Sequence, residues 1–285
     1  MKKIIFSAWI VLLLSACSNN IQQENIITVT IEPQRYFTEQ LVDSLFRVEC
    51  MVPAGISPET YDPAPAQMVK LARSKAYFCI GHIGFEEVWI EKLKENYPKI
   101  TFFDNSHGIE LVISGHTHPA GNSHEHGADP HIWSSPKSVR LIVQNMYEAL
   151  LEIDPANKNQ YAANLHRLLE KIDTVDKQVT QILQNSSQNA FIIYHPALTY
   201  FARDYGLTQF SIEADGKEPS PEQLKILIEA AKENNIKTIF VQQEFDQKNA
   251  QSIARQTGCR LVIINPLSYD WGKEMLHIAQ SLSDE

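Results

Sequence analysis

The chain has 285 residues, with 25 Lys and Arg against 34 Asp and Glu, a formal net charge of −9, 44% apolar residues and a mean hydropathy of −0.24. These values exclude a disordered chain and a protein made mainly of membrane-spanning helices, and without a basic excess nucleic acid is not an expected partner. At roughly 150 residues per domain, the length predicts about two domains, each able to bury a hydrophobic core.

The N-terminus carries the pattern of an export signal. Two lysines precede an apolar run over residues 4–14 that is too short to span a bilayer as a helix. The run ends in Leu-Ser-Ala-Cys, which resembles the lipobox of bacterial lipoproteins, with Cys17 as the lipidated first residue of the mature chain. The alternative is ordinary secretory cleavage after Ala16. Both interpretations predict that the mature chain leaves the cytoplasm.

Two runs of short apolar strands alternating with helical stretches follow. The first run predicts strands and helices in the order 26–31, 36–45, 47–52, 65–72, 76–80, 86–96 and 100–103. The second predicts them in the order 190–194, 198–205, 208–212, 221–234, 238–241, 247–257 and 260–264. This rhythm predicts an α/β fold with two similar lobes, each a parallel β-sheet flanked by helices.

A single long helix is expected between the two runs. Residues 155–185 place apolar side chains at helical spacing and contain no Gly or Pro after Pro155. The pattern lacks a strict heptad, which favours a rigid rod packed on its own lobes, in a monomer, over a coiled coil. The predicted division is listed in chain order: signal peptide and lipidated cysteine 1–17, tether 18–25, N-terminal lobe 26–154, linking helix 155–186 and C-terminal lobe 187–285.

Three cysteines remain once Cys17 is assigned to lipidation. An odd number does not form a disulfide framework in an oxidising compartment. Cys50 and Cys79 both lie in strand-like segments and are expected to be neighbours that are either bridged or buried as small apolar groups. Cys259 is the third.

Five of the ten histidines fall in one stretch of the chain. The polar, glycine-bearing loop over residues 115–127 holds four of them, and His131 follows it. A short His-rich tract predicts a mobile loop with weak, exchangeable metal contacts, whereas the alternative is a solvated loop without function. The predicted secondary metal ligands are His116, His118, His124 and His126.

A tighter metal site is predicted from residues at the ends of rigid elements. His131 lies just before a helix start, with Ser135 as N-cap and Pro136 in the first turn. His195 follows a predicted strand, at the edge where open α/β sheets place ligand groups, and Glu59 lies in a proline-stiffened loop after another strand. Two imidazoles and a carboxylate are ordinary zinc ligands, so we expect them to converge between the lobes.

These motifs together resemble those of the zinc- and manganese-binding lipoproteins of bacterial ABC importers. The similar segments are the lipobox, Pro-Ala-Gly-Ile-Ser-Pro-Glu-Thr-Tyr-Asp-Pro, the His-rich loop, Asp-Pro-His-Ile-Trp, Tyr-His-Pro-Ala-Leu-Thr-Tyr-Phe and Asn-Pro-Leu. The resemblance covers nearly the whole mature chain. It implies two α/β lobes joined by a long rigid helix, with one metal ion held in the cleft between them and passed to a membrane permease.

Carried over position by position, the resemblance implies four metal ligands. His131 and His195 fall on the second and third ligand positions, and His at the third is typical of zinc importers. Glu59 stands where His is usual, and Asn265 stands where Asp is usual. Because an amide oxygen is a weaker partner for zinc, the fourth position is open to Asn265, water, Glu244 or a loop histidine.

The predicted function is therefore high-affinity capture of a divalent metal ion outside the cytoplasm, most simply Zn²⁺ with Mn²⁺ as the alternative, and delivery to an ABC permease. No catalytic activity is expected. One alternative is an exported metallohydrolase, because Gly115-His116-Thr117-His118 matches a metallophosphoesterase element, although the upstream Asp-rich motifs are missing. The other is a surface lipoprotein that sequesters metal or mediates adhesion. The expected location is a bacterial membrane, in the periplasm or at the cell surface, held by the lipid anchor.

Two further residues receive a purely structural interpretation. Trp133 is expected to pack beside the metal site, and Glu213 is expected to be a surface turn residue.

Overall fold

The computed structural model describes residues 23–113, 127–213 and 219–283. The predicted lipidation site Cys17 and the four histidines of the His-rich loop lie outside these residues. Among the helices of the described ranges, none is both long and apolar enough to cross a membrane.

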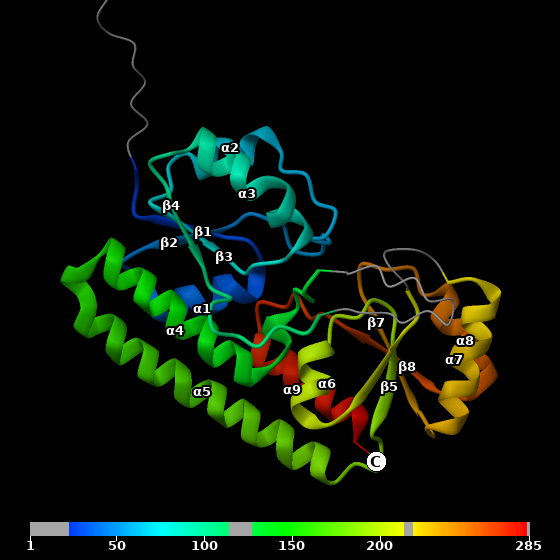
Figure 1. Ribbon diagram of the computed structural model, residues 1–285. Coiled ribbons are helices and arrows are strands. Elements are labelled where there is room, and N and C mark those ends of the chain that lie inside the picture. The colour runs from blue at the N-terminus through cyan, green and yellow to red at the C-terminus, as the bar shows by residue number, and fades with distance from the viewer. Residues whose placement is uncertain (1–22, 114–126, 214–218, 284–285) are drawn as a thin grey trace, which may run out of the picture.

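Two lobes of the same topology make up the fold (Figure 1). The first holds β1 (Ile26–Val29), α1 (Glu32–Val42), β2 (Arg47–Cys50), α2 (Pro65–Leu71), β3 (Ala76–Cys79), α3 (Gly84–Asn96) and β4 (Thr101–Asp104). The second holds β5 (Ala190–Ile193), α6 (Thr199–Tyr205), β6 (Thr208–Ser211), α7 (Pro221–Glu233), β7 (Thr238–Gln242), α8 (Lys248–Thr257), β8 (Arg260–Ile264) and α9 (Trp271–Leu282). Every strand pair is parallel, in the orders β2-β1-β3-β4 and β6-β5-β7-β8, which confirms the predicted α/β fold.

The shared strand order gives each lobe one point where the chain changes direction across the sheet. From the first strand the chain moves outward to one neighbour and then crosses back to the other side. These switch points lie between β1 and β3 and between β5 and β7. The carboxyl ends of strands at a switch point are the usual place for ligand groups in open α/β sheets.

Two long antiparallel helices connect the lobes. α4 (Pro136–Ile153) begins where the sequence predicts, because the Ser135 side chain accepts a hydrogen bond from the Lys137 amide at 3.2 Å and Pro136 opens the helix. The predicted long helix is α5 (Lys158–Gln184), preceded by a 3₁₀ turn at Pro155–Asn157. Its 27 residues reach about 40 Å, and the helix passes beneath both lobes in Figure 1. α5 packs on α1 of the first lobe and on α9 after the second sheet.

One hydrophobic core runs through both lobes. Alternate residues of the central strands face it: Val29 and Phe78 from the first sheet, and Ile193 and Phe240 from the second. The same core takes in buried residues of α1, α4, α5, α6 and α9. Smaller clusters lie on the outer faces of the sheets, under α2 and α3 in the first lobe and under α7 and α8 in the second. Since burial of apolar surface is the main stabilising term, the two lobes are expected to be stabilised together.

Aromatic contacts join the lobes next to α9. The Phe37 ring of α1 meets the Trp271 ring edge to face with centroids 5.3 Å apart, and Tyr36 meets Tyr269 in the same way at 5.5 Å. Phe37 and Trp271 are both fully or almost fully buried. Such pairs add stability beyond their burial, so this contact opposes separation of the lobes.

The cysteines are free in the described chain, so the bridged alternative for Cys50 and Cys79 is wrong. The two residues lie on β2 and β3, which are separated by β1. Two strand spacings place them roughly 10 Å apart, beyond the reach of a disulfide. Burial raises the pKa of both thiols, which keeps them protonated.

Replacing Phe37 with Ala should lower the free energy of unfolding by about 3–5 kcal/mol, because a large buried ring is lost between the lobes. Unfolding should remain a single transition, since the core is continuous. Urea unfolding followed by tryptophan fluorescence and far-ultraviolet circular dichroism measures both. Val88→Ala, at a side chain 55% exposed on α3, is the control and should change stability by less than about 0.5 kcal/mol. Two separated transitions would contradict a shared core.

Candidate metal centre

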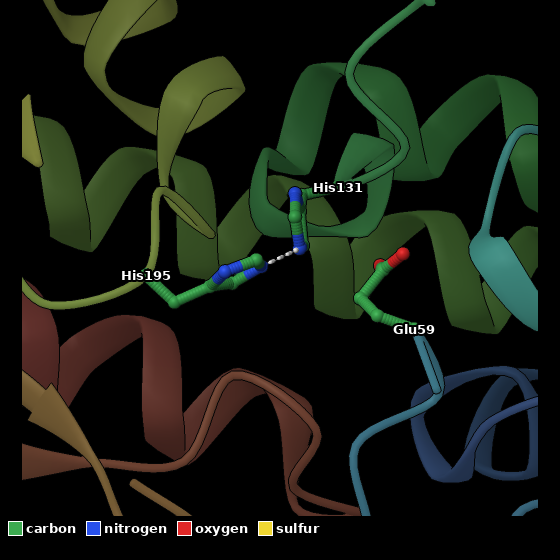
Figure 2. A group of neighbouring side chains, drawn as sticks. All are labelled: Glu59, His131 and His195. Atoms are coloured by element: carbon green, nitrogen blue, oxygen red, sulfur yellow. Dashed lines mark hydrogen bonds between the residues drawn. The ribbon is translucent and has the colours of Figure 1, made fainter. Parts of the chain in front are cut away.

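Three of the four predicted ligands, Glu59, His131 and His195, meet at a small cavity between the lobes, whereas Asn265 does not line it. The volume of the cavity is about 20 Å³, which is room for one ion or one water molecule. Figure 2 shows Glu59, His131 and His195 approaching one another from three separate segments. The ligand atoms of these three residues all lie within 4.8 Å of one another. The cavity is lined by Ser57, Pro58, Glu59, His131, Trp133, His195, Ala197, Gln242, Glu244, Phe245, Pro266 and Leu267.

His131 is buried and its ring is oriented by a neighbouring carboxylate. Oδ1 of Asp129 lies 2.9 Å from Nδ1 of His131 and also accepts the backbone N–H of His131 at 2.9 Å. The Tyr200 hydroxyl donates to the backbone carbonyl of Asp129 at 2.7 Å, which ties this segment to α6. A carboxylate on Nδ1 fixes the proton there and leaves the Nε2 lone pair free for a metal.

His195 is held in the same manner in the second lobe. Its Nδ1 lies 3.3 Å from both carboxylate oxygens of Glu213, which follows β6. Gln242, at the end of β7, binds the backbone of His195 from both sides: its Nε2 donates to the carbonyl at 2.6 Å and its Oε1 accepts the amide at 3.3 Å. His195 therefore sits at the β5–β7 switch point with a fixed ring orientation.

The surface-turn interpretation of Glu213 is wrong, because the residue is only 9% exposed and faces His195. The sequence offered one signal that could have identified it, its position directly after a strand in the lobe that carries His195. The sequence also gave no indication that Gln242 holds His195 or that Gly84 holds Glu59. Trp133 does line the cavity, as expected, and its indole N–H donates to the carbonyl of Pro266 at 2.9 Å.

The two imidazoles point their Nε2 atoms at each other across 3.2 Å. Without a cation between them, one Nε2 donates a proton to the other, and a metal ion would replace that proton. Two nitrogens bound to one tetrahedral zinc at about 2.0–2.1 Å are separated by about 3.3 Å. The observed spacing therefore suits two imidazoles on the same ion.

Glu59 faces the pair from the first lobe. The backbone N–H of Gly84, the first residue of α3, donates to Glu59 Oε2 at 3.1 Å, and the positive end of the helix stabilises the carboxylate. The other oxygen, Oε1, is buried and has no hydrogen-bond partner in the described structure. An unpaired buried carboxylate oxygen is costly, and a bound cation would remove that cost.

Asn265 and Glu244 differ in their relation to the cavity. The Asn265 side-chain oxygen accepts the backbone N–H of Leu267 at 3.2 Å, and its neighbours Pro266 and Leu267 line the cavity. Glu244, on the turn after β7, is half-buried and lines the cavity directly. Burial raises the pKa of the Glu244 carboxyl, and the nearby His195 and His131 oppose that shift.

The charges around His131 favour its protonated form. Burial lowers the pKa of His131, but Asp129, Glu59 and Glu213 together outweigh burial, so the pKa lies above the ordinary value of 6.5. The pKa of Asp129 is correspondingly lowered, because His131 and its hydrogen bonds outweigh the effect of burial. The ring thus binds a positive charge well, whether a proton or a metal ion.

Comparison with known proteins identifies relatives over almost the whole chain. The family model described as "Zinc-uptake complex component A periplasmic" matches residues 27–284. The zinc-binding lipoprotein AdcA of Streptococcus pneumoniae is 29% identical over 94% of this chain and 56% of AdcA, so the chain spans about half the length of that relative. The high-affinity zinc uptake system protein ZnuA of Bacillus subtilis is 26% identical over 90% of this chain and 85% of ZnuA.

Solved structures share the fold of this chain over most of its length. A crystal structure of ZnuA is 39% identical and superimposes with a TM-score of 0.83, covering 90% of this chain and 96% of the other. The Mn²⁺ complex of FpvC from Pseudomonas aeruginosa is 22% identical with a TM-score of 0.77, covering 90% and 96% of the two chains, and shows the shared fold alone.

Gly84→Ala should weaken Zn²⁺ binding by at least about tenfold, because a Cβ at residue 84 would lie 2.4 Å from the Glu59 carbonyl oxygen and 2.9 Å from Oε2 and would displace the carboxylate. Competition titration with a zinc chelator dye measures the effect. Gly127→Ala is the matched control, because its added Cβ meets Glu87 only at 3.9 Å. Equal affinities of the two variants would show that Glu59 does not need its bond to α3.

Zn²⁺ affinity should fall as pH decreases, by about tenfold per pH unit for one displaced proton, starting at the raised pKa of His131. Asp129→Asn removes the charge that raises this pKa, so the fall should begin at lower pH, while affinity at neutral pH drops by roughly 10- to 100-fold. Titrations between about pH 5.5 and pH 8 check both statements. Asp173→Asn, at an exposed carboxylate on α5, should leave the profile unchanged. An unshifted profile in Asp129→Asn would refute control by this carboxylate.

Proposed function

Because the chain belongs to the periplasmic zinc-uptake component A family, we propose that it captures Zn²⁺ outside the cytoplasm and delivers the ion to an ABC permease. His131, His195 and Glu59 hold the ion in the cleft. The observation that carries the proposal is the 3.2 Å approach of two Nε2 atoms beside a buried, unpaired carboxylate oxygen. Asp129 and Glu213 orient the two rings from behind.

The donor set favours zinc over manganese. Two imidazole nitrogens and one carboxylate oxygen suit a borderline ion such as Zn²⁺, whereas Mn²⁺ prefers oxygen donors. Copper and nickel bind nitrogen sites at least as tightly in vitro, so selectivity for zinc depends on geometry and on metal supply. We expect Mn²⁺ to bind more weakly to the same residues.

A binding role suits the site better than catalysis. The cavity of about 20 Å³ holds one ion, and an organic substrate would need the lobes to part. The shared core and the aromatic contact between Phe37 and Trp271 oppose such opening. We therefore propose a receptor without catalytic activity. Its movements on binding are small and confined to the turns that carry the ligands.

Attachment and delivery follow from the sequence motifs. We propose that Cys17 carries a lipid that tethers a monomeric receptor to the membrane, next to the permease. The proposed secondary ligands His116, His118, His124 and His126 would bind further ions weakly.

Protein lacking residues 1–17 should bind about one Zn²⁺ per chain tightly, and the double variant His131→Ala/His195→Ala should lose this ion, because both nitrogen donors are removed. Elemental analysis after dialysis and zinc titration measure the stoichiometry. His166→Ala/His277→Ala is the matched control, since both rings are exposed on helices. Full retention of zinc in the first variant would rule out the cleft as the tight site.

A further inference from the structure

Zinc in proteins is usually four-coordinate, and Glu59, His131 and His195 supply three donors. We propose that Glu244, on the turn after β7, supplies the fourth, so that two imidazoles and two carboxylates hold the ion. This inference rests on the proposed function, because it concerns the same cleft.

The position of Glu244 in the fold supports this role. His195 follows β5 and Glu244 follows β7, and these paired strands flank the switch point of the second sheet. The carboxyl ends of such strands are where ligand groups converge. Glu244 also lines the cavity that the other three ligands line.

Asn265 is engaged elsewhere. Its side-chain oxygen accepts the backbone N–H of Leu267 at 3.2 Å, and its backbone N–H donates to the Glu274 carboxylate at 2.7 Å. These bonds hold the Asn265 turn in place, and ligation by Asn265 would require its side-chain oxygen to exchange a hydrogen bond for the metal. A neutral amide is also a poorer donor to zinc than a carboxylate.

Ligation requires a local movement. The Glu244 carboxylate lies outside the group of ligand atoms that are within 4.8 Å of one another, so the turn after β7 has to move inward. The next residue, Phe245, stacks on the His195 ring with centroids 5.5 Å apart and planes inclined by 20°. The turn is therefore in contact with the ring of a proposed ligand.

Cobalt spectroscopy of two cysteine variants tests direct ligation. Co²⁺ replaces Zn²⁺ in such sites, and a cobalt–thiolate bond gives an intense charge-transfer band that nitrogen and oxygen ligands lack. Glu244→Cys should show this band, whereas Asn265→Cys and the otherwise unaltered protein lacking residues 1–17 should not, because Cys50, Cys79 and Cys259 do not line the cavity. A band in Asn265→Cys alone, or in neither variant while one Co²⁺ is still bound, would overturn the proposal.

Affinity measurements provide a second arm. Glu244→Gln should keep one Zn²⁺ per chain but bind it at least about tenfold more weakly, whereas Asn265→Ala should change affinity by less than about threefold. Asp246→Asn, at an exposed carboxylate of the same turn, is the matched control. Melting of each metal-free variant shows whether it is folded. A larger loss in Asn265→Ala would overturn the proposal and leave zinc capture intact, whereas failure of the unaltered protein to bind zinc would refute the proposed function itself.

Discussion

The proposed metal centre depends on two Nε2 atoms being held 3.2 Å apart, with a ring orientation that both lobes maintain. Neither ring is free to turn away, because Asp129 fixes one and Glu213 fixes the other. The rings come from different parts of the chain, so their spacing is only as constant as the relation between the lobes. A single core beneath both sheets, crossed by α4 and α5, keeps that relation constant. Metal affinity is therefore expected to depend on the whole fold and not on the ligand residues alone.

The two lobes share a topology but use it differently. In the second lobe the switch point is open, and Gln242 presents His195 there. In the first lobe the equivalent point is filled by Glu86, which accepts from the amides of Ile80 and Gly81 and from Thr30, and burial raises its pKa to about 7. With that point closed, the first lobe contributes its ligand from another place, the loop that carries Glu59. This difference explains why the proposed ligand of the second lobe, His195, follows a strand. The proposed ligand of the first lobe, Glu59, instead lies on a loop that is bonded to the start of α3.

The sequence predicted the parallel sheets, the long helix and the convergence of Glu59, His131 and His195, because alternating apolar runs and rigid strand ends are local features. For Glu213 it offered only the position after a strand, because the role of this residue depends on which strand lies beside β5. Gly84 was hidden for the same reason, since its lack of a side chain matters only where α3 meets Glu59. The bridged alternative for Cys50 and Cys79 is wrong because β1 lies between their strands. In each case the missing information was spatial order across a sheet or between elements.

The residues at the first and last ligand positions, Glu59 and Asn265, differ from those usual in the family, and the surroundings of Glu59 give a physical reason. Where the family resemblance leads one to expect His and Asp, this chain has Glu59 and Asn265, so a carboxylate moves from the second lobe to the first. It is accommodated there because the start of α3 offers a backbone N–H and the positive end of a helix dipole. The second lobe then lacks a charged donor of its own at the Asn265 turn. On the proposal made for Glu244, a carboxylate after β7 gives the second lobe a charged oxygen donor in place of the neutral amide of Asn265.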